Sequence, residues 1–266
     1  MKSRTRKLQS QRRQPSKRRI RKMKEFHFEV DELILQGKMF FPARQPKGKL
    51  PAVLLVHGWN GSERGYIPVA RQLAALGMVA MTVNLRGHGR SQGSKETCSR
   101  QNHLRDLKAA YDLLAAHPRV DPKRIGAHGA SYACHLLSLL SVERDLRWLA
   151  LRAPATYEDR LFDAPVVTIV DERLKRYRLR KVTPRSNRGL RALSRFTGDL
   201  LIISGGRDTT VPPQTVANNL AAARSAASVV HRHYKRADHV LSRPSQGRQA
   251  TGALIKWFQE RLKSKG

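Results

Sequence analysis

One short stretch, residues 125–134, constrains the fold of this chain more than any other part of it. It is an apolar run, followed by Gly129-Ala130-Ser131-Tyr132-Ala133 and then by residues that favour a helix. A serine held on a sharp turn between a strand and a helix needs this pattern, because bulky residues two positions before or after it would crowd the turn. The sequence therefore predicts a strand that ends at Ser131, a helix that follows it, and a candidate reactive hydroxyl at the junction.

The rest of the chain alternates apolar runs with amphipathic segments. Apolar runs typical of strands buried on both faces of a sheet occupy residues 52–56, 78–85, 148–151 and 199–203. Helical spacing of apolar residues predicts helices at residues 64–76, 102–116, 214–223 and 250–262. An alternating pattern at residues 26–41 predicts an antiparallel hairpin that turns around Gln36-Gly37, and residues 120–124 are predicted to be a turn. This order predicts an α/β fold with helices on both faces of a mostly parallel sheet.

The formal net charge is +32, and eleven of the positive charges lie in residues 1–22, which hold no acid. Such a block repels itself and is expected to be disordered. It could be an arm for nucleic acid or another acidic surface, a targeting extension, or a segment that is not translated because the start is Met23. We favour the start at Met23. Without residues 1–22 the chain still carries +21, so its body is basic as well.

Composition argues against several classes of protein. The two cysteines, Cys98 and Cys134, form neither a disulfide framework nor a zinc-site spacing, and Cys134 is expected to be a buried packing residue. No apolar run approaches the roughly 20 residues that a membrane span requires. No secretory signal is recognisable, so the expected location is the cytoplasm.

Four candidate site positions follow predicted strands or lie in the loops after them: His57-Gly58-Trp59, Ser131, Asp208 and His239. In an α/β sheet, sites lie at the carboxyl ends of the strands. The order serine, acid, histidine is the one described for α/β-hydrolases.

With these residues in order, the chain from about residue 26 to residue 262 resembles a serine hydrolase of the α/β-hydrolase superfamily, in its esterase, prolyl-oligopeptidase-like or dienelactone-hydrolase-like branch. The resemblance covers nearly everything except the basic leader. It implies an α/β-hydrolase domain over residues 23–266, with a short cap-like insertion at about residues 156–197. The motifs that carry it are His57-Gly58, Arg86-Gly87-His88-Gly89-Arg90-Ser91, Asp121-Pro122, Gly129-Ala130-Ser131, Gly205 with Asp208, Val211-Pro212 and Asp238-His239.

The resemblance also implies roles for individual residues. Ser131 would attack a carbonyl carbon, His239 would take its proton and return it to the leaving group, and Asp208 would orient the imidazole. The backbone N–H groups of Trp59 and Tyr132 would form the oxyanion hole. No metal and no organic cofactor is expected.

Two departures from the family pattern concern the turn itself. Ala133 replaces the usual second glycine, and Cys134 replaces the glycine that often follows it. These substitutions raise the question of whether the helix can approach closely enough to leave Ser131 exposed and the Tyr132 N–H directed into the oxyanion hole.

Several residues have a competing interpretation. Asp238 could be the acid in place of Asp208, but it is adjacent to His239, and the side chains of neighbouring residues in a loop diverge. His231 and His233 share one face of a strand and could form a metal pair, but no cluster of carboxylates or cysteines accompanies them, so we interpret them as polar sheet residues. Structural roles are expected for the remaining histidines near the motifs, namely His57, His88 and His128.

The segment at residues 173–195 holds ten Lys/Arg and no acid. It could be a positively charged lid that selects anionic acyl substrates, or the solvated face of a protein that is basic everywhere. We favour the solvated face, because the positive surplus is not confined to this segment.

These observations predict a hydrolase of carboxylic esters that acts on a small-molecule substrate through an acyl-enzyme on Ser131. A small serine peptidase and a thioesterase would use the same chemistry, as would haloperoxidase-like and acyltransferase enzymes. The alternative from another class is a non-catalytic scaffold that binds nucleic acid through residues 1–22. The oligomeric state cannot be predicted from the sequence.

Overall fold

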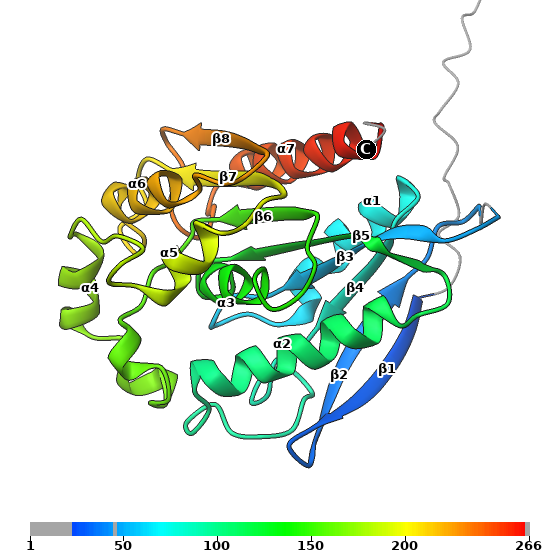
Figure 1. Cartoon of the computed structure of the whole chain (residues 1–266), viewed down its shortest axis with the longest axis horizontal. Coiled ribbons are helices and arrows are strands. Elements are labelled where there is room, and N and C mark those ends of the chain that lie inside the picture. The colour runs from blue at the N-terminus through cyan, green and yellow to red at the C-terminus, as the bar shows by residue number, and fades with distance from the viewer. Residues whose placement is uncertain (1–22, 45–46, 264–266) are drawn as a thin grey trace, which may run out of the picture.

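Eight strands form one sheet in the computed structural model, which describes residues 23–44 and 47–263 (Figure 1). In chain order they are β1 (Met23–Val30), β2 (Leu33–Phe40), β3 (Leu50–Val56), β4 (Val79–Val83), β5 (Val120–Ala130), β6 (Trp148–Arg152), β7 (Asp199–Gly205) and β8 (Ser228–Tyr234). Their spatial order is β1-β2-β4-β3-β5-β6-β7-β8. β2 is antiparallel to β1 and β4, and the other neighbouring strands are parallel. The predicted α/β class, with a mostly parallel sheet and an N-terminal antiparallel hairpin, is confirmed.

Helices cover both faces of the sheet (Figure 1). Among the described residues they are α1 (Ile67–Ala75), α2 (Arg100–Ala115), α3 (Tyr132–Leu140), α4 (Glu172–Arg178), α5 (Arg188–Leu193), α6 (Pro213–Ala222) and α7 (Pro244–Lys263). Helices α1 and α7 pack on one face, and α2, α3, α5 and α6 pack on the other. None of the described helices combines the length and the apolar character needed to cross a membrane.

Strand β3 shows why the central strands are continuous apolar runs. All seven of its residues are buried. Val53 and Leu55 pack in the layer that holds α1 and α7, whereas Leu54 and Val56 pack in the opposite layer. Because successive side chains of a strand point to opposite faces, a strand covered on both sides needs an apolar residue at every position.

The N-terminal hairpin is present, but its turn lies elsewhere than predicted. The turn is Asp31-Glu32, whose φ angles are 49° and 62°, and Gln36-Gly37 lies inside β2. Gly37 pairs with Phe26 across the hairpin, and a Cβ at this position would overlap the Phe26 ring and come close to the Thr82 carbonyl oxygen. The glycine therefore serves packing within the sheet.

One further local prediction is wrong. Residues 120–124 belong to β5, where the register against β3 shifts between Leu50 and Ala52. In the segment 156–197, which holds α4 and α5, the N-cap of α5 is Asn187, whose side chain accepts a hydrogen bond from the Leu190 N–H at 2.9 Å.

The division into a leader at residues 1–22 and a domain at residues 23–266 stays a prediction. Residues 1–22 lie outside the described part of the chain, and so does any arm formed by them.

Candidate active site

Ser131 lies in the turn between β5 and α3, at the carboxyl end of a central strand. Its backbone has φ 55° and ψ −113°, a conformation that costs on the order of 1–3 kcal/mol for a residue with a side chain. The turn is fixed on both sides, because the Ser131 N–H donates to the Arg152 carbonyl at 2.8 Å and the Cys134 N–H donates to the Ser131 carbonyl at 3.0 Å. This backbone sets the serine at the mouth of a pocket.

The missing side chain of Gly129 makes room for Ala133. A Cβ on Gly129 would lie 2.8 Å from the Ala133 Cβ and 2.9 Å from Leu137 Cδ1. The Cys134 thiol is buried against the carbonyl of Gly129, and burial raises its pKa to about 12, so it remains a neutral packing group. The close approach of α3 to β5 thus needs a small residue before Ser131 and accepts alanine after it.

We expect Gly129→Ala to lower the free energy of unfolding by about 1–3 kcal/mol, because the added methyl would be forced against Ala133 and Leu137. Urea unfolding followed by circular dichroism measures this loss. The matched control is Gly252→Ala, at an exposed position of α7 with no atom within 4 Å of the added Cβ, where a gain of about 0.5–1 kcal/mol is expected. Equal effects of the two substitutions would contradict the packing argument.

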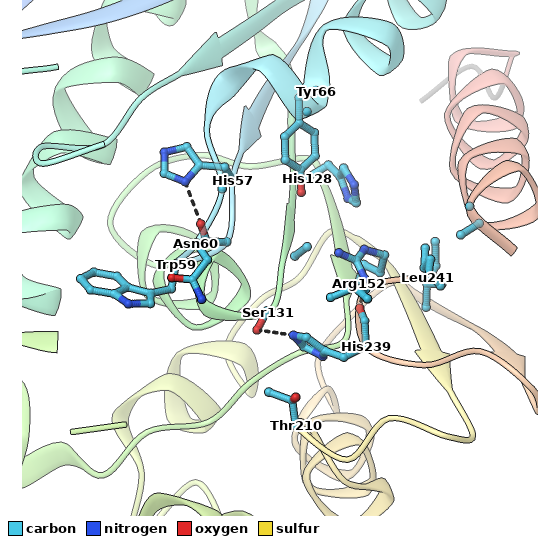
Figure 2. Close-up of a pocket in the computed structure, with 18 of the residues that line it drawn as sticks. His57, Trp59, Asn60, Tyr66, His128, Ser131, Arg152, Thr210, His239 and Leu241 are labelled. Carbon is cyan, nitrogen blue, oxygen red and sulfur yellow. Dashed lines mark hydrogen bonds between the residues drawn. The ribbon is translucent and has the colours of Figure 1, made fainter. Parts of the chain in front are cut away.

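Ser131, His239 and Asp208 form a hydrogen-bonded chain. Figure 2 shows its first bond, between Ser131 and His239. Ser131 Oγ lies 3.0 Å from His239 Nε2, and His239 Nδ1 lies 2.8 Å from Asp208 Oδ2. Asp208 follows β7 and His239 follows β8, so the three residues meet at the carboxyl edge of the sheet, although 108 positions separate the serine from the histidine.

The carboxylate of Asp208 is buried and oriented by the backbone. Its Oδ1 accepts hydrogen bonds from the N–H groups of Thr210 at 3.0 Å and Val211 at 2.8 Å, which leaves Oδ2 for His239. The competing acid, Asp238, accepts hydrogen bonds from the backbone N–H and the hydroxyl of Ser242. The geometry therefore pairs His239 with Asp208.

The two predicted oxyanion donors also lie beside Ser131. Tyr132 is the first residue of α3, and Trp59 follows β3, with its ring 5.5 Å from the Tyr132 ring between centroids. Neither backbone N–H has a hydrogen-bond acceptor among the described residues. Both amides are thus available to a ligand, and a helix N-terminus favours negative charge.

The rings of His88 and His103 pack against those of Trp59 and Tyr132. No sequence motif predicts this group of rings. Burial lowers the pKa of His103 to about 3, so its ring is neutral. From its partners, His103 Nε2–H donates to the Arg86 carbonyl at 3.1 Å, and Nδ1 accepts from the Tyr132 hydroxyl at 2.7 Å. His88 Nε2 lies 2.7 Å from the Trp59 carbonyl. These bonds anchor Trp59 and Tyr132, the two residues predicted to supply the oxyanion donors.

The remaining histidines near the motifs have local partners. His57 Nδ1 donates to the Gly58 carbonyl at 2.8 Å, and its Nε2 accepts from the Leu85 N–H at 3.2 Å. The rings of His231 and His233 both contact the hydroxyl of Ser204, at 2.8 and 3.0 Å. No group of three or more His, Cys, Asp or Glu in the described part of the chain could hold a metal ion.

Ser131 and His239 open onto a pocket of about 700 Å³. The segment 156–197 contributes Tyr157, Val170 and Arg178 to its wall, and Arg152 at the end of β6 also lines it. The arginines were not singled out from the sequence, because 52 Lys and Arg residues in one chain give an individual arginine no distinguishing signal.

Comparison with known proteins identifies the family. The model of the prolyl oligopeptidase family matches residues 68–265, a stretch that includes Ser131, Asp208 and His239. The chain belongs to the prolyl oligopeptidase family. Its resemblance to the α/β-hydrolase superfamily is thereby confirmed.

Curated relatives of this member of the prolyl oligopeptidase family include two uncharacterized proteins from strains of Mycobacterium tuberculosis. Each is 29% identical over 187 residues, which is 70% of this chain and 62% of the relative. The match therefore spans less than two thirds of the length of these relatives.

Solved structures with the same fold include esterases and peptidases. Est1E from Butyrivibrio proteoclasticus with bound ferulic acid has a TM-score of 0.70 at 18% identity, over 90% of this chain and 100% of the other. Acylaminoacyl peptidase from Pyrococcus horikoshii has a TM-score of 0.71 at 18% identity, over 93% of this chain and 43% of the peptidase chain. Acetyl xylan esterase 1 from Thermoanaerobacterium sp. JW/SL YS485 has a TM-score of 0.65 at 21% identity, over 91% of this chain and 88% of the esterase chain. At 18–21% identity, these likenesses confirm the predicted α/β-hydrolase fold class.

Proposed function

We propose that this member of the prolyl oligopeptidase family hydrolyses carboxylic esters through an acyl-enzyme on Ser131. The observation that carries the proposal is the hydrogen-bonded chain from Ser131 through His239 to Asp208 at the wall of a pocket. An ordinary turn serine needs neither a histidine at hydrogen-bond distance nor a buried carboxylate behind that histidine.

The reaction would proceed in two halves. Ser131 Oγ attacks the ester carbonyl while its proton passes to His239 Nε2, and the oxyanion that forms is held by the N–H groups of Trp59 and Tyr132. His239 then returns the proton to the departing alcohol, which leaves Ser131 acylated. Water attacks the acyl-enzyme with His239 as base, and the acid is released. Asp208 keeps the proton of neutral His239 on Nδ1 and stabilises the imidazolium.

An ester rather than an amide is favoured by the extent of the structural likeness. It covers 100% of the Est1E chain and 88% of the acetyl xylan esterase chain, but 43% of the acylaminoacyl peptidase chain. The peptidase alternative has its own support in the family match. A panel of p-nitrophenyl esters of increasing acyl length, run beside p-nitroanilides and thioesters of the same acids, separates the three classes. We expect turnover of the esters, and preferential turnover of the anilides would assign a peptidase instead.

A fluorophosphonate probe tests the nucleophile directly. We expect the wild-type chain to be labelled and Ser131→Ala to remain unlabelled, because the probe forms a bond only with an activated serine. The matched control is Ser204→Ala. It removes a serine that also contacts two histidines, but no described carboxylate is hydrogen-bonded to those histidines. This variant should be labelled like the wild type. A folded wild-type sample that takes up no probe would overturn the proposal.

A further inference from the structure

The pocket beside Ser131 is lined by positive and not by negative side chains. Among its described lining residues there is no aspartate or glutamate, whereas Arg152 and Arg178 are both present. Asp208 stands behind His239 and is held by it and by two backbone amides. A guanidinium stays charged at every pH at which a protein is folded. The question is which of the two arginines has donors left for a ligand.

Arg178 is engaged by the protein itself. Its side chain is buried, its Nη1 donates to the Thr210 carbonyl at 2.9 Å, and its Nε lies 3.3 Å from the Thr156 carbonyl. The guanidinium also lies over the ring of Tyr157, 4.8 Å from the centroid. These contacts join α4 to the loop that carries Asp208, so Arg178 has a structural role.

Arg152 differs because most of its donors are unused. Its Nη1 donates to the backbone carbonyl of His239 at 2.8 Å, which is the one hydrogen bond found for this guanidinium among the described residues. It forms no ion pair with any described aspartate or glutamate, although it lies only partly exposed in the pocket wall. A carbonyl dipole does not neutralise a charge, and a partly desolvated guanidinium gains most from a bidentate anion.

The neighbours of Arg152 supply hydrogen-bonding groups but no charge. Figure 2 shows Tyr66, His128 and Arg152 on one side of the pocket, above the Ser131–His239 pair in that view. Burial raises the pKa of Tyr66 to about 12, so its hydroxyl keeps its proton, and no described residue accepts from it. Burial lowers the pKa of His128 to about 4, and its Nδ1 donates to the Ala150 carbonyl at 2.9 Å. Both groups are neutral near pH 7.

Beyond these polar groups the wall is aliphatic, with Val69, Ile203 and Leu254 from α1, β7 and α7. We propose that Arg152 binds a carboxylate of the substrate, with the Tyr66 hydroxyl as a second donor, so that the preferred esters carry a free carboxylate at the end of an aliphatic spacer. The carboxylate could belong to the acyl chain or to the alcohol. This inference rests on the proposed ester hydrolysis at Ser131.

The test compares kcat/KM for esters that differ only in that carboxylate. One pair places it on the acyl side, p-nitrophenyl hydrogen glutarate against p-nitrophenyl pentanoate. The other pair places it on the alcohol side, 3-carboxypropyl pentanoate against butyl pentanoate. We expect the charged member of one pair to be preferred by about 10- to 100-fold in the wild type, because a charge-assisted bidentate contact is stronger than a neutral one. The ratio should fall to within about 3-fold in Arg152→Gln and recover in part in Arg152→Lys.

The ratio is the readout because Arg152 also contacts the His239 backbone, so its loss can slow both members of a pair equally. Arg195→Gln is the matched control, since it removes an exposed arginine that does not line the pocket and should leave the ratio unchanged. A wild-type ratio near one for both pairs, or a preference that survives in Arg152→Gln, would overturn the carboxylate site while leaving ester hydrolysis intact. Absence of both turnover and fluorophosphonate labelling would overturn the hydrolase proposal and this inference with it.

Discussion

Replacing Ser131 by alanine is expected to lower kcat for the best ester by roughly 10⁶-fold. Loss of the serine or of the histidine of such a triad removes the covalent route altogether and leaves only what oxyanion binding and orientation contribute. Asp208→Asn is expected to cost roughly 10⁴-fold, because an amide in place of the buried carboxylate favours the wrong tautomer of His239. Steady-state kinetics measures both values, with active-site titration to exclude contaminating wild-type enzyme.

The same experiment contains its own control for cooperation between the residues. If Ser131 and His239 act as a unit, the double variant Ser131→Ala, His239→Ala should be no slower than either single variant. Circular dichroism would verify that each variant is folded. A folded Ser131→Ala chain that retains more than about a hundredth of the wild-type kcat would contradict the assignment of Ser131 as nucleophile.

Acid is expected to destabilise the fold well above the pH at which carboxylates titrate. Four buried imidazoles are kept neutral by desolvation: burial lowers the pKa of His57 and His128 to about 4 and of His103 to about 3, and holds that of His135 well below its ordinary value. Below pH 6.5 these histidines become protonated in the unfolded chain but stay neutral in the folded chain. The free energy of unfolding therefore falls as the pH falls. Each such histidine contributes a loss of about 2 kcal/mol between pH 7 and pH 5.

Urea unfolding at pH 7 and pH 5 measures this loss, in a range that lies above the ordinary pKa values of Asp and Glu. His135→Leu should reduce the difference between the two pH values by about 2 kcal/mol, because it deletes one buried imidazole whose Nε2 has no hydrogen-bond partner among the described residues. His27→Gln, at an exposed position of β1, should leave the difference unchanged. A pH dependence that is the same in His135→Leu and in the wild type would show that this histidine does not titrate on unfolding.

The order of strands and helices could be predicted from the sequence. A central strand that is buried on both faces needs an unbroken run of apolar residues, as in β3, and such a run is easy to recognise. The hairpin turn could not. Asp31 and Glu32 have positive φ angles, although such turns usually contain a glycine. Gly37 is a residue type typical of turns, but here it is required for packing against Phe26. A glycine that relieves a tertiary contact looks, in one sequence, like a glycine that bends the chain.

The candidate site likewise contains residues that could be predicted from the sequence and residues that could not. Ser131, Asp208 and His239 carry local signals, namely small neighbours, a loop after a strand, and their order along the chain. The imidazole of His103 and the guanidinium of Arg152 have no such signals, because each acts through a residue far away in the sequence: Tyr132 in one case and the His239 carbonyl in the other. Arg178 lies in the basic segment, whose other lysines and arginines are exposed or only partly buried, and only its contacts distinguish it.

The position of β8 at one edge of the sheet has a consequence for aggregation. It bonds to β7 on one side, and its other backbone edge has no partner among the described strands. The loop that follows it carries His239, the proposed general base. Free edges invite pairing with a second chain, and charged side chains oppose it. Arg232 is exposed along this strand, and Lys235 and Arg236 are exposed just after it. The positive charges on and after β8 thus oppose edge-to-edge association at the strand that leads to His239.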